Sequence, residues 1–129
     1  MVVLSVLLAA AAGFASGAIW YGVFGRRWAA AIGRSEAEVK TGRAPMPFAV
    51  AALGAVVAAG MMRHVFAASG VATGGAGLVA GFGVGAFLVL PWLLSGYAFE
   101  RRPRDLWWID GGHVVLACAL IGLVLGLMA

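Results

Sequence analysis

The stretch VFAASGVATGGAGLVAGFGVGAFLVLPWLLSGYAF, residues 65–99, contains no charged residue and decides the fold. A helix needs about 20 apolar residues to cross the hydrocarbon core of a bilayer, which is about 30 Å thick. The stretch is too long for one ordinary span, and its segment SGVATGG at residues 69–75 is typical of a turn. The sequence therefore predicts one helix over about 47–68 and another over about 75–99, the latter kinked by Pro91, which cannot donate a backbone hydrogen bond.

The rest of the chain repeats this arrangement of uncharged runs separated by short charged stretches. Residues 1–25, 44–62 and 111–129 also lack Lys, Arg, Asp and Glu. With 64% hydrophobic and 11% charged residues, a soluble domain of 129 residues would be covered in apolar surface. We therefore expect an all-α, polytopic membrane protein, a single four-transmembrane-helix bundle over residues 1–129 with spans at about 2–24, 47–68, 75–99 and 106–128.

The first apolar run resembles a secretory signal only in part. It lacks the positive n-region of such peptides, and it runs without interruption to Trp20 and Tyr21, an aromatic pair of the kind found at membrane interfaces. We expect a retained first span, with the loop at 25–46 on the water side. Ser35 and Glu38 fit a capping box, so this loop should contain a short helix lying against the headgroups.

Two further sets of residues define that loop. Helix-breaking residues follow the short helix at Gly42, Pro45 and Pro47. The apolar side chains of Trp28, Ala31 and Ile32 precede it and would hold the loop against the membrane surface.

Charge distribution predicts the orientation of the bundle. Eight of the nine Lys and Arg residues lie in the loops after the first and third spans. The positive-inside rule places those loops in the cytoplasm and both termini outside, with Tyr97, Trp107 and Trp108 at the cytoplasmic interface and Asp105 as the N-cap of the last span. The formal charge of +4 is confined to loops, so we expect membrane lipids with anionic headgroups as partners and no nucleic acid.

Glycines at four-residue spacing mark helix faces that allow close packing. Such spacing occurs in the first, third and last spans. The glycines are Gly13, Gly17, Gly77, Gly81, Gly85, Gly122 and Gly126. Two interpretations remain open, namely packing within one bundle and the seam of a homodimer.

Ionisable residues near the ends of the spans are the candidates for a polar pocket. At the cytoplasmic end these are Glu100, Arg102, Asp110 and His113, of which Asp110 and His113 share one side of the last span. A clasp of ion pairs between the carboxylates and the neighbouring arginines is one interpretation, and a pocket at the cytoplasmic mouth is the other. At the opposite end, Arg63 and His64 either anchor the second span or line an outward-facing pocket.

The sequence offers no pattern typical of an enzyme or a metal site. It contains no nucleophile elbow and no phosphate-binding glycine loop followed by lysine, and GFGVG at residues 81–85 lies within a predicted span with no preceding strand. One Asp, one Glu and one His form an incomplete metal-ligand set. Cys118 is the only cysteine, which excludes an intrachain disulfide. We expect neither catalysis nor a cofactor or metal.

Three motifs together resemble the bacterial family known as domain of unknown function 1761. They are Trp20-Tyr21-Gly22 with Phe24-Gly25 and Trp28, then Glu100-Arg101-Arg102-Pro103, then Ile109-Asp110 with Gly112-His113. His113 stands where tyrosine is expected. The resemblance covers essentially the whole chain and implies a small four-span protein of the bacterial inner membrane, with periplasmic termini given the predicted orientation and with no established activity.

Two classes of function follow from these features. The first is a non-catalytic membrane subunit or accessory protein that self-associates, or joins a larger complex, through its glycine-rich faces. The second is a small transport or permeation module with Arg63 and His64 at one end and Glu100, Asp110 and His113 at the other. Coupled carriers usually place ionisable residues near the midplane, and the sequence has none there.

Overall fold

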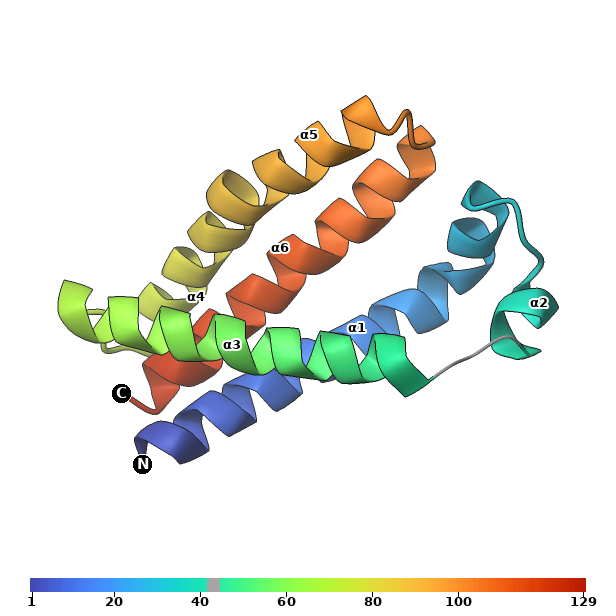
Figure 1. Ribbon diagram of the computed structural model, residues 1–129. Coiled ribbons are helices and arrows are strands. Elements are labelled where there is room, and N and C mark those ends of the chain that lie inside the picture. The colour runs from blue at the N-terminus through green and yellow to red at the C-terminus, as the bar shows by residue number, and fades with distance from the viewer. Residues whose placement is uncertain (42–44) are drawn as a thin grey trace.

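A computed structural model describes residues 1–41 and 45–129 of the chain (Figure 1). Within those ranges the chain is all-helical and has no strand, as predicted. The elements are α1 (Val2–Ala31), α2 (Glu36–Thr41), α3 (Pro45–Ser69), α4 (Gly74–Gly83), the π-helical segment η1 (Val84–Val89), α5 (Leu90–Phe99) and α6 (Arg104–Leu127).

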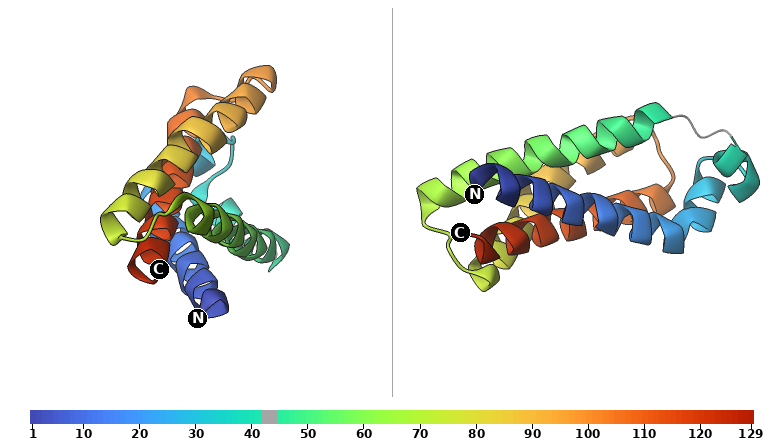
Figure 2. Two further views of the ribbon diagram at one scale, coloured as in Figure 1. Left: turned by 90° about the vertical axis from the view of Figure 1, so that its left-hand side faces the viewer. Right: turned by 90° about the horizontal axis from the view of Figure 1, so that it is seen from below.

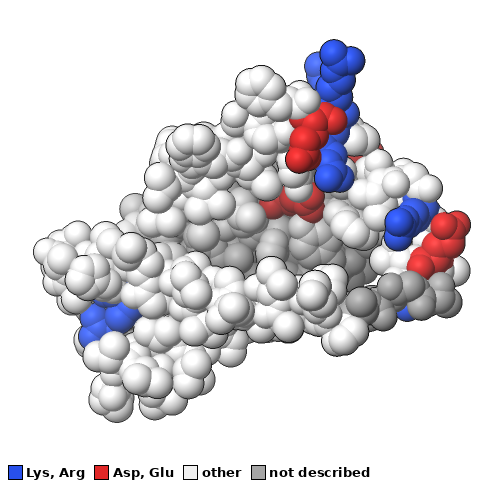
Figure 3. Space-filling view, viewed as in Figure 1, with Lys and Arg blue, Asp and Glu red and all other residues white. Residues whose placement is uncertain are grey.

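Four helical stretches are long and apolar enough to cross a membrane. They are α1, α3, the continuous stretch from Gly74 to Phe99, and α6, which confirms the four-span prediction. Both termini lie at one end of the bundle, whereas α2 and the turn between α5 and α6 lie at the other, which we call the loop end (Figure 1). Figure 3 shows charged side chains gathered at the loop end, with a broad uncharged surface beside them and a further basic patch near the far end of α3.

The first span is longer than predicted, because α1 continues past residue 24 to Ala31 and includes Trp28. The apolar run ends near Gly25, but the backbone hydrogen bonds of a helix do not depend on apolar side chains. The helix stops at Gly33, whose φ of 78° is left-handed, and the N–H of Arg34 bonds the carbonyl of Ala29 at 2.9 Å. This is the Schellman termination that glycine favours.

The loop after α1 contains the predicted short helix. The N–H of Glu38 donates to the hydroxyl of Ser35 at 3.1 Å, which confirms the Ser35 part of the capping box. Pro45 and Pro47 do not break a helix here but lie in the first turn of α3. Proline fits that position because the first N–H groups of a helix have no intrahelical partner. The predicted breaker Gly42 lies outside the described residues.

The third span was predicted to depart from a regular α-helix at Pro91, and it does so in the turn before that residue. In η1 the helix widens, and the N–H of Leu90 bonds the carbonyl of Gly85, five residues back. A proline ring clashes with the carbonyl four residues before it, and the wider turn relieves that contact.

The start of the last span differs from the prediction that Asp105 is its N-cap. The helix begins at Arg104 after Pro103, and Asp105 lies within the first turn. Its carboxylate accepts a hydrogen bond from the indole of Trp108 at 3.2 Å. A carboxylate in the first turn still interacts favourably with the helix dipole.

The centre of the bundle is α6, which packs against α1 on one side and α4 on the other (Figure 2). Glycines make the contact with α4 close: a Cβ on Gly77 would overlap the carbonyl oxygen of Gly122, and one on Gly81 would overlap that of Cys118. Gly85 meets the Cα of Val115, and Gly126 meets the carbonyl of Thr73.

These contacts match the first of the two interpretations of the glycine spacing. The glycine faces of the third and last spans pack against each other within one chain. Self-association of the protein stays a prediction.

The second span is held mainly by α1, with fewer contacts to α6. Its buried side chains are Ala59, Met62 and Phe66, which join Ile121 and Leu125 of α6 in one apolar cluster. The rest of α3 is largely exposed in the isolated chain, as expected for a helix that faces lipid. Towards the loop end, residues of α3 and α5 line a common cavity.

Candidate functional site

The crossing of α1 and α6 brings together residues far apart in the sequence. The indole Nε1 of Trp20 donates to the carbonyl oxygen of Ile109 at 2.8 Å. The Trp20 ring covers Gly112, where an added Cβ would lie 2.6 Å from Cζ2. Phe24 packs edge-on against Trp108 with ring centroids 5.1 Å apart. This aromatic contact fixes the position of the first turns of α6 relative to α1.

Next to this contact, the carboxylate of Asp110 is held by two tyrosines from different helices. The hydroxyl of Tyr21 on α1 donates to Oδ1, and the hydroxyl of Tyr97 on α5 donates to Oδ2. Because an ionised carboxylate is a pure acceptor, two phenolic donors suit its charged form. Asp110 thus links three of the four spans.

One turn further along α6, His113 faces α1. Its Nε2 would lie 2.7 Å from a Cβ on Gly17, so a larger residue there would have to displace the imidazole. This nitrogen is buried and has no hydrogen-bond partner among the described residues. The imidazole also packs against the Tyr21 ring at a centroid distance of 5.2 Å. Asp110 and His113 therefore lie on one side of α6, as their spacing predicted.

Glu100 does not join Asp110. Its carboxylate pairs with Nε of Arg102 at 2.9 Å, and both side chains are about half exposed at the turn between α5 and α6. This ion pair raises the pKa of Arg102. The Glu100 part of the predicted ion-pair clasp is therefore present, whereas Asp110 accepts its hydrogen bonds from tyrosine hydroxyls.

The other two candidates lie elsewhere. Arg63 and His64 are on the part of α3 that leads away from the loop end. Nε of Arg63 is buried and has no hydrogen-bond partner in the described part of the chain, while His64 is exposed. Neither lines the cleft described next, so the structure does not bring the two predicted polar groups into one path.

Two adjoining chambers that share lining residues lie between α1, α3, α5 and α6, and we call them together the α3 cleft. The loop-end chamber has a volume of about 690 Å³. Its polar lining comes from Arg34, Tyr21, Tyr97 and Asp110. The remaining lining residues are mainly apolar: Trp28, Ile32, Val39, Pro47, Phe48, Ala51, Leu93 and Val114. Acidic atoms are visible in the hollow between α3 and α5 in Figure 3.

The inner chamber continues the cleft away from the loop end, with a volume of about 440 Å³. It shares Tyr21, Phe48, Ala51 and Val114 with the loop-end chamber. Apart from His113 and the shared Tyr21, its lining consists of apolar and small residues of α1, α3, η1 and α6. The α3 cleft is therefore polar at one end and apolar along the rest of its length.

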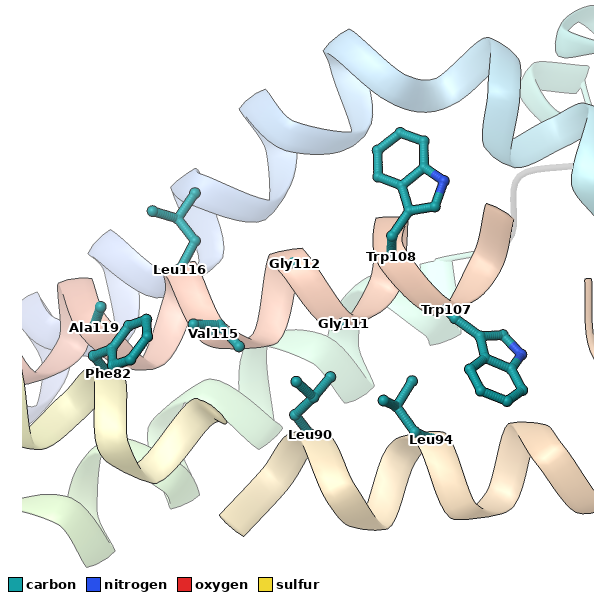
Figure 4. Close-up of a pocket in the computed structure, with 10 residues that line it drawn as sticks. All are labelled: Phe82, Leu90, Leu94, Trp107, Trp108, Gly111, Gly112, Val115, Leu116 and Ala119. Atoms are coloured by element: carbon teal, nitrogen blue, oxygen red, sulfur yellow. The ribbon is translucent and has the colours of Figure 1, made fainter. Parts of the chain in front are cut away.

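A separate groove of about 620 Å³ lies between α6 and the helices α4 and α5 (Figure 4). Figure 4 shows Leu90 and Leu94 pointing across it towards α6, with Trp107 at one end and Phe82 at the other. No residue that lines it is ionisable, so it offers a lipid chain apolar contact and no specific polar contact. Ionisable residues line the α3 cleft instead.

Within the described ranges, no three His, Cys, Asp or Glu side chains come together as a metal site. Cys118 is a buried free thiol in the wall of the inner chamber.

Sequence reasoning missed the partners of Asp110. It placed Tyr97 at the membrane interface and Tyr21 in an aromatic anchor, and it assigned neither to the polar pocket. The one available signal was their depth, because both tyrosines lie at the loop end of their spans, as Asp110 does. Arg34 was counted only as a loop charge.

Comparisons with known proteins place these contacts in context. A sequence profile described as "Protein of unknown function (DUF1761)" matches residues 4–126. No curated protein and no solved structure matches the chain. The matched range includes Trp20, Tyr21, Asp110 and His113, whose motifs meet at the crossing of α1 and α6. The chain belongs to the DUF1761 family of proteins of unknown function.

Proposed function

We propose that this protein resides in the bacterial inner membrane, with its arginine-rich loops in the cytoplasm and both termini in the periplasm. The four apolar spans and the gathering of basic side chains at the loop end support this orientation.

Cysteine labelling tests the orientation. In a Cys118→Ala background, Ala72→Cys in the turn between α3 and α4 should react with a membrane-impermeant maleimide added to intact spheroplasts. Arg34→Cys at the loop end should react only after the membrane is permeabilised. The reverse pattern would contradict the orientation.

Within that membrane, we infer a non-catalytic binding role, in which the α3 cleft holds one amphipathic molecule. The observation that carries this inference is the polarity of the cleft, with Arg34, Tyr97 and Asp110 at the loop end and an apolar inner chamber beyond them. A ligand with a polar head and an apolar body matches that distribution. Binding is favoured over catalysis because both oxygens of Asp110 are already engaged by tyrosine hydroxyls.

Blocking the junction of the two chambers tests the binding role. Ala51 lines both chambers, so Ala51→Trp should displace a bound amphiphile that the unmodified protein retains in mild detergent, as measured by native mass spectrometry. Ala52→Trp is the matched control, since Ala52 is exposed on α3 and lines neither chamber. Equal retention by both variants would contradict the proposal.

A second candidate is an accessory subunit of a membrane complex. It is favoured by α3, the least buried of the four spans, which exposes most of its length. Such a partner would pack on α3 rather than on the glycine faces, which are occupied within the chain. Stoichiometric co-purification of another protein, with no bound amphiphile, would favour this candidate over the binding role.

A further inference from the structure

Asp110 is a carboxylate within a membrane span and is fixed in place. It lies six residues into α6, which corresponds to roughly 9 Å below the start of that helix. Tyr21 and Tyr97 orient it from two other helices. An ionisable side chain inside a span is costly and needs a compensating partner.

The compensation that Asp110 receives from the described residues, 1–41 and 45–129, is incomplete. Two neutral hydroxyls are its hydrogen-bond partners, while the nearby guanidinium of Arg102 forms an ion pair with Glu100. A carboxylate has about four acceptor positions, so two remain open on Asp110 after the tyrosine bonds. Because Asp110 lines the loop-end chamber, a ligand in that chamber can supply the missing positive charge.

Aromatic side chains surround the same position. Tyr21, Trp28 and Tyr97 all line the loop-end chamber, and the rings of Tyr21 and Trp28 meet edge-to-face with centroids 6.2 Å apart. Aromatic faces attract cations, and together with a carboxylate they form a site typical of ammonium recognition. Tyr97 already interacts with one cation, because the guanidinium of Arg102 lies 5.8 Å from its ring centroid.

The order of groups along the cleft restricts the ligand further. Arg34 lines only the loop-end chamber, whereas Tyr21, which holds Asp110, also lines the inner chamber with His113 and Ala117. A ligand whose apolar body fills the inner chamber therefore meets Asp110 before Arg34. In a glycerophospholipid the phosphate lies between the acyl chains and any ammonium group, so its anionic group would reach Asp110 first.

The geometry points to a lipophilic amine as the ligand of the α3 cleft, with an ammonium group attached directly to an apolar chain. The ammonium pairs with Asp110 among Tyr21, Trp28 and Tyr97, and the chain extends past His113 into the inner chamber. This inference rests on the proposed binding role of the cleft and adds the charge and the chemical class of its ligand.

Four probes of equal chain length test the inference on the full chain in nanodiscs of uncharged lipid. They are tetradecylammonium, tetradecanol, tetradecylphosphocholine and tetradecyl sulfate, with binding measured by calorimetry. The ammonium probe is expected to bind most tightly. Asp110→Asn is expected to weaken that binding by about 30-fold or more, because it removes one partner of a partly buried charge pair. Its affinity for tetradecanol should stay unchanged.

Glu100→Gln is the matched control, since it removes an acidic charge near the loop end that lies outside the cleft and pairs with Arg102. Its affinity for the ammonium probe should equal that of the unmodified protein. The comparison of the four probes on the unmodified protein needs no variant, so it remains decisive even if Asp110→Asn folds poorly.

The possible results distinguish the assignment of the ligand as an amine from the proposed binding role of the cleft. Equal binding of all four probes, unaffected by Asp110→Asn, would overturn the amine assignment and leave the binding role of the cleft intact. Preference for the phosphocholine or the sulfate would likewise overturn it in favour of a zwitterionic or anionic ligand. Failure of every probe to bind would overturn the binding role itself.

Discussion

Gly77→Leu is expected to separate the third span from α6 and to lower the free energy of unfolding by about 3 kcal/mol or more. Even a Cβ at this position would overlap the carbonyl oxygen of Gly122, and it would lie 3.0 Å from the Cα of Gly126. Both obstacles belong to backbone, which cannot rotate away as a side chain can. Reversible unfolding in mixed micelles, followed by circular dichroism, measures the loss.

Gly75→Leu provides the control, because it places the same side chain on the same helix. No described atom lies within 4 Å of a Cβ added to Gly75. Its free energy of unfolding should stay within about 0.5 kcal/mol of the unmodified protein. If Gly77→Leu proved as stable as this control and only changed the oligomeric state in light scattering, the glycine face would pack between chains and not within one.

The four spans could be predicted because a single property, the absence of charged residues, determines which segments can enter a bilayer. The uncharged segments are residues 1–25, 44–62, 65–99 and 111–129. The ends of the helices follow other rules. Apolarity stops near Gly25, but α1 continues until Gly33 supplies a left-handed backbone, so the first span was predicted too short. At α6, Pro103 precedes the helix and Asp105 falls inside it, which capping preferences alone did not indicate.

The candidate site was predictable only in part, for a physical reason. Asp110 and His113 share a helix, so a spacing of three residues was enough to place them on one side of it. The bond from Tyr21 to Asp110 joins residues 89 apart in the sequence and depends on how α1 crosses α6. Glycine spacing likewise identified the face of Gly77 and Gly81 but not the helix that it contacts, because a four-residue period describes one helix and not its neighbour.

Tyr21 and Tyr97 hold Asp110 through their two hydroxyls. The double variant Tyr21→Phe, Tyr97→Phe is expected to lose about 3 kcal/mol or more of unfolding free energy, because it leaves a carboxylate in the bundle without donors. Adding Asp110→Ala to that variant should recover most of the loss, since the uncompensated charge is then gone. Such non-additivity is typical of groups that share one hydrogen-bond network.

A comparison with Trp107→Phe shows whether the loss of stability is specific to the donors of Asp110 or follows from removing a hydrogen bond anywhere. That variant removes an exposed bond of 3.1 Å from the indole to the carbonyl of Arg102 and should change stability by no more than about 0.5 kcal/mol. If the triple variant were as unstable as the double, the tyrosines would act through ring packing, and Asp110 would not be the group that makes their hydroxyls necessary. Recovery in the triple variant would instead show that the charge of Asp110 destabilises the fold once its donors are removed. A destabilising charge that the protein nevertheless keeps is expected of a carboxylate that pairs with a cationic ligand.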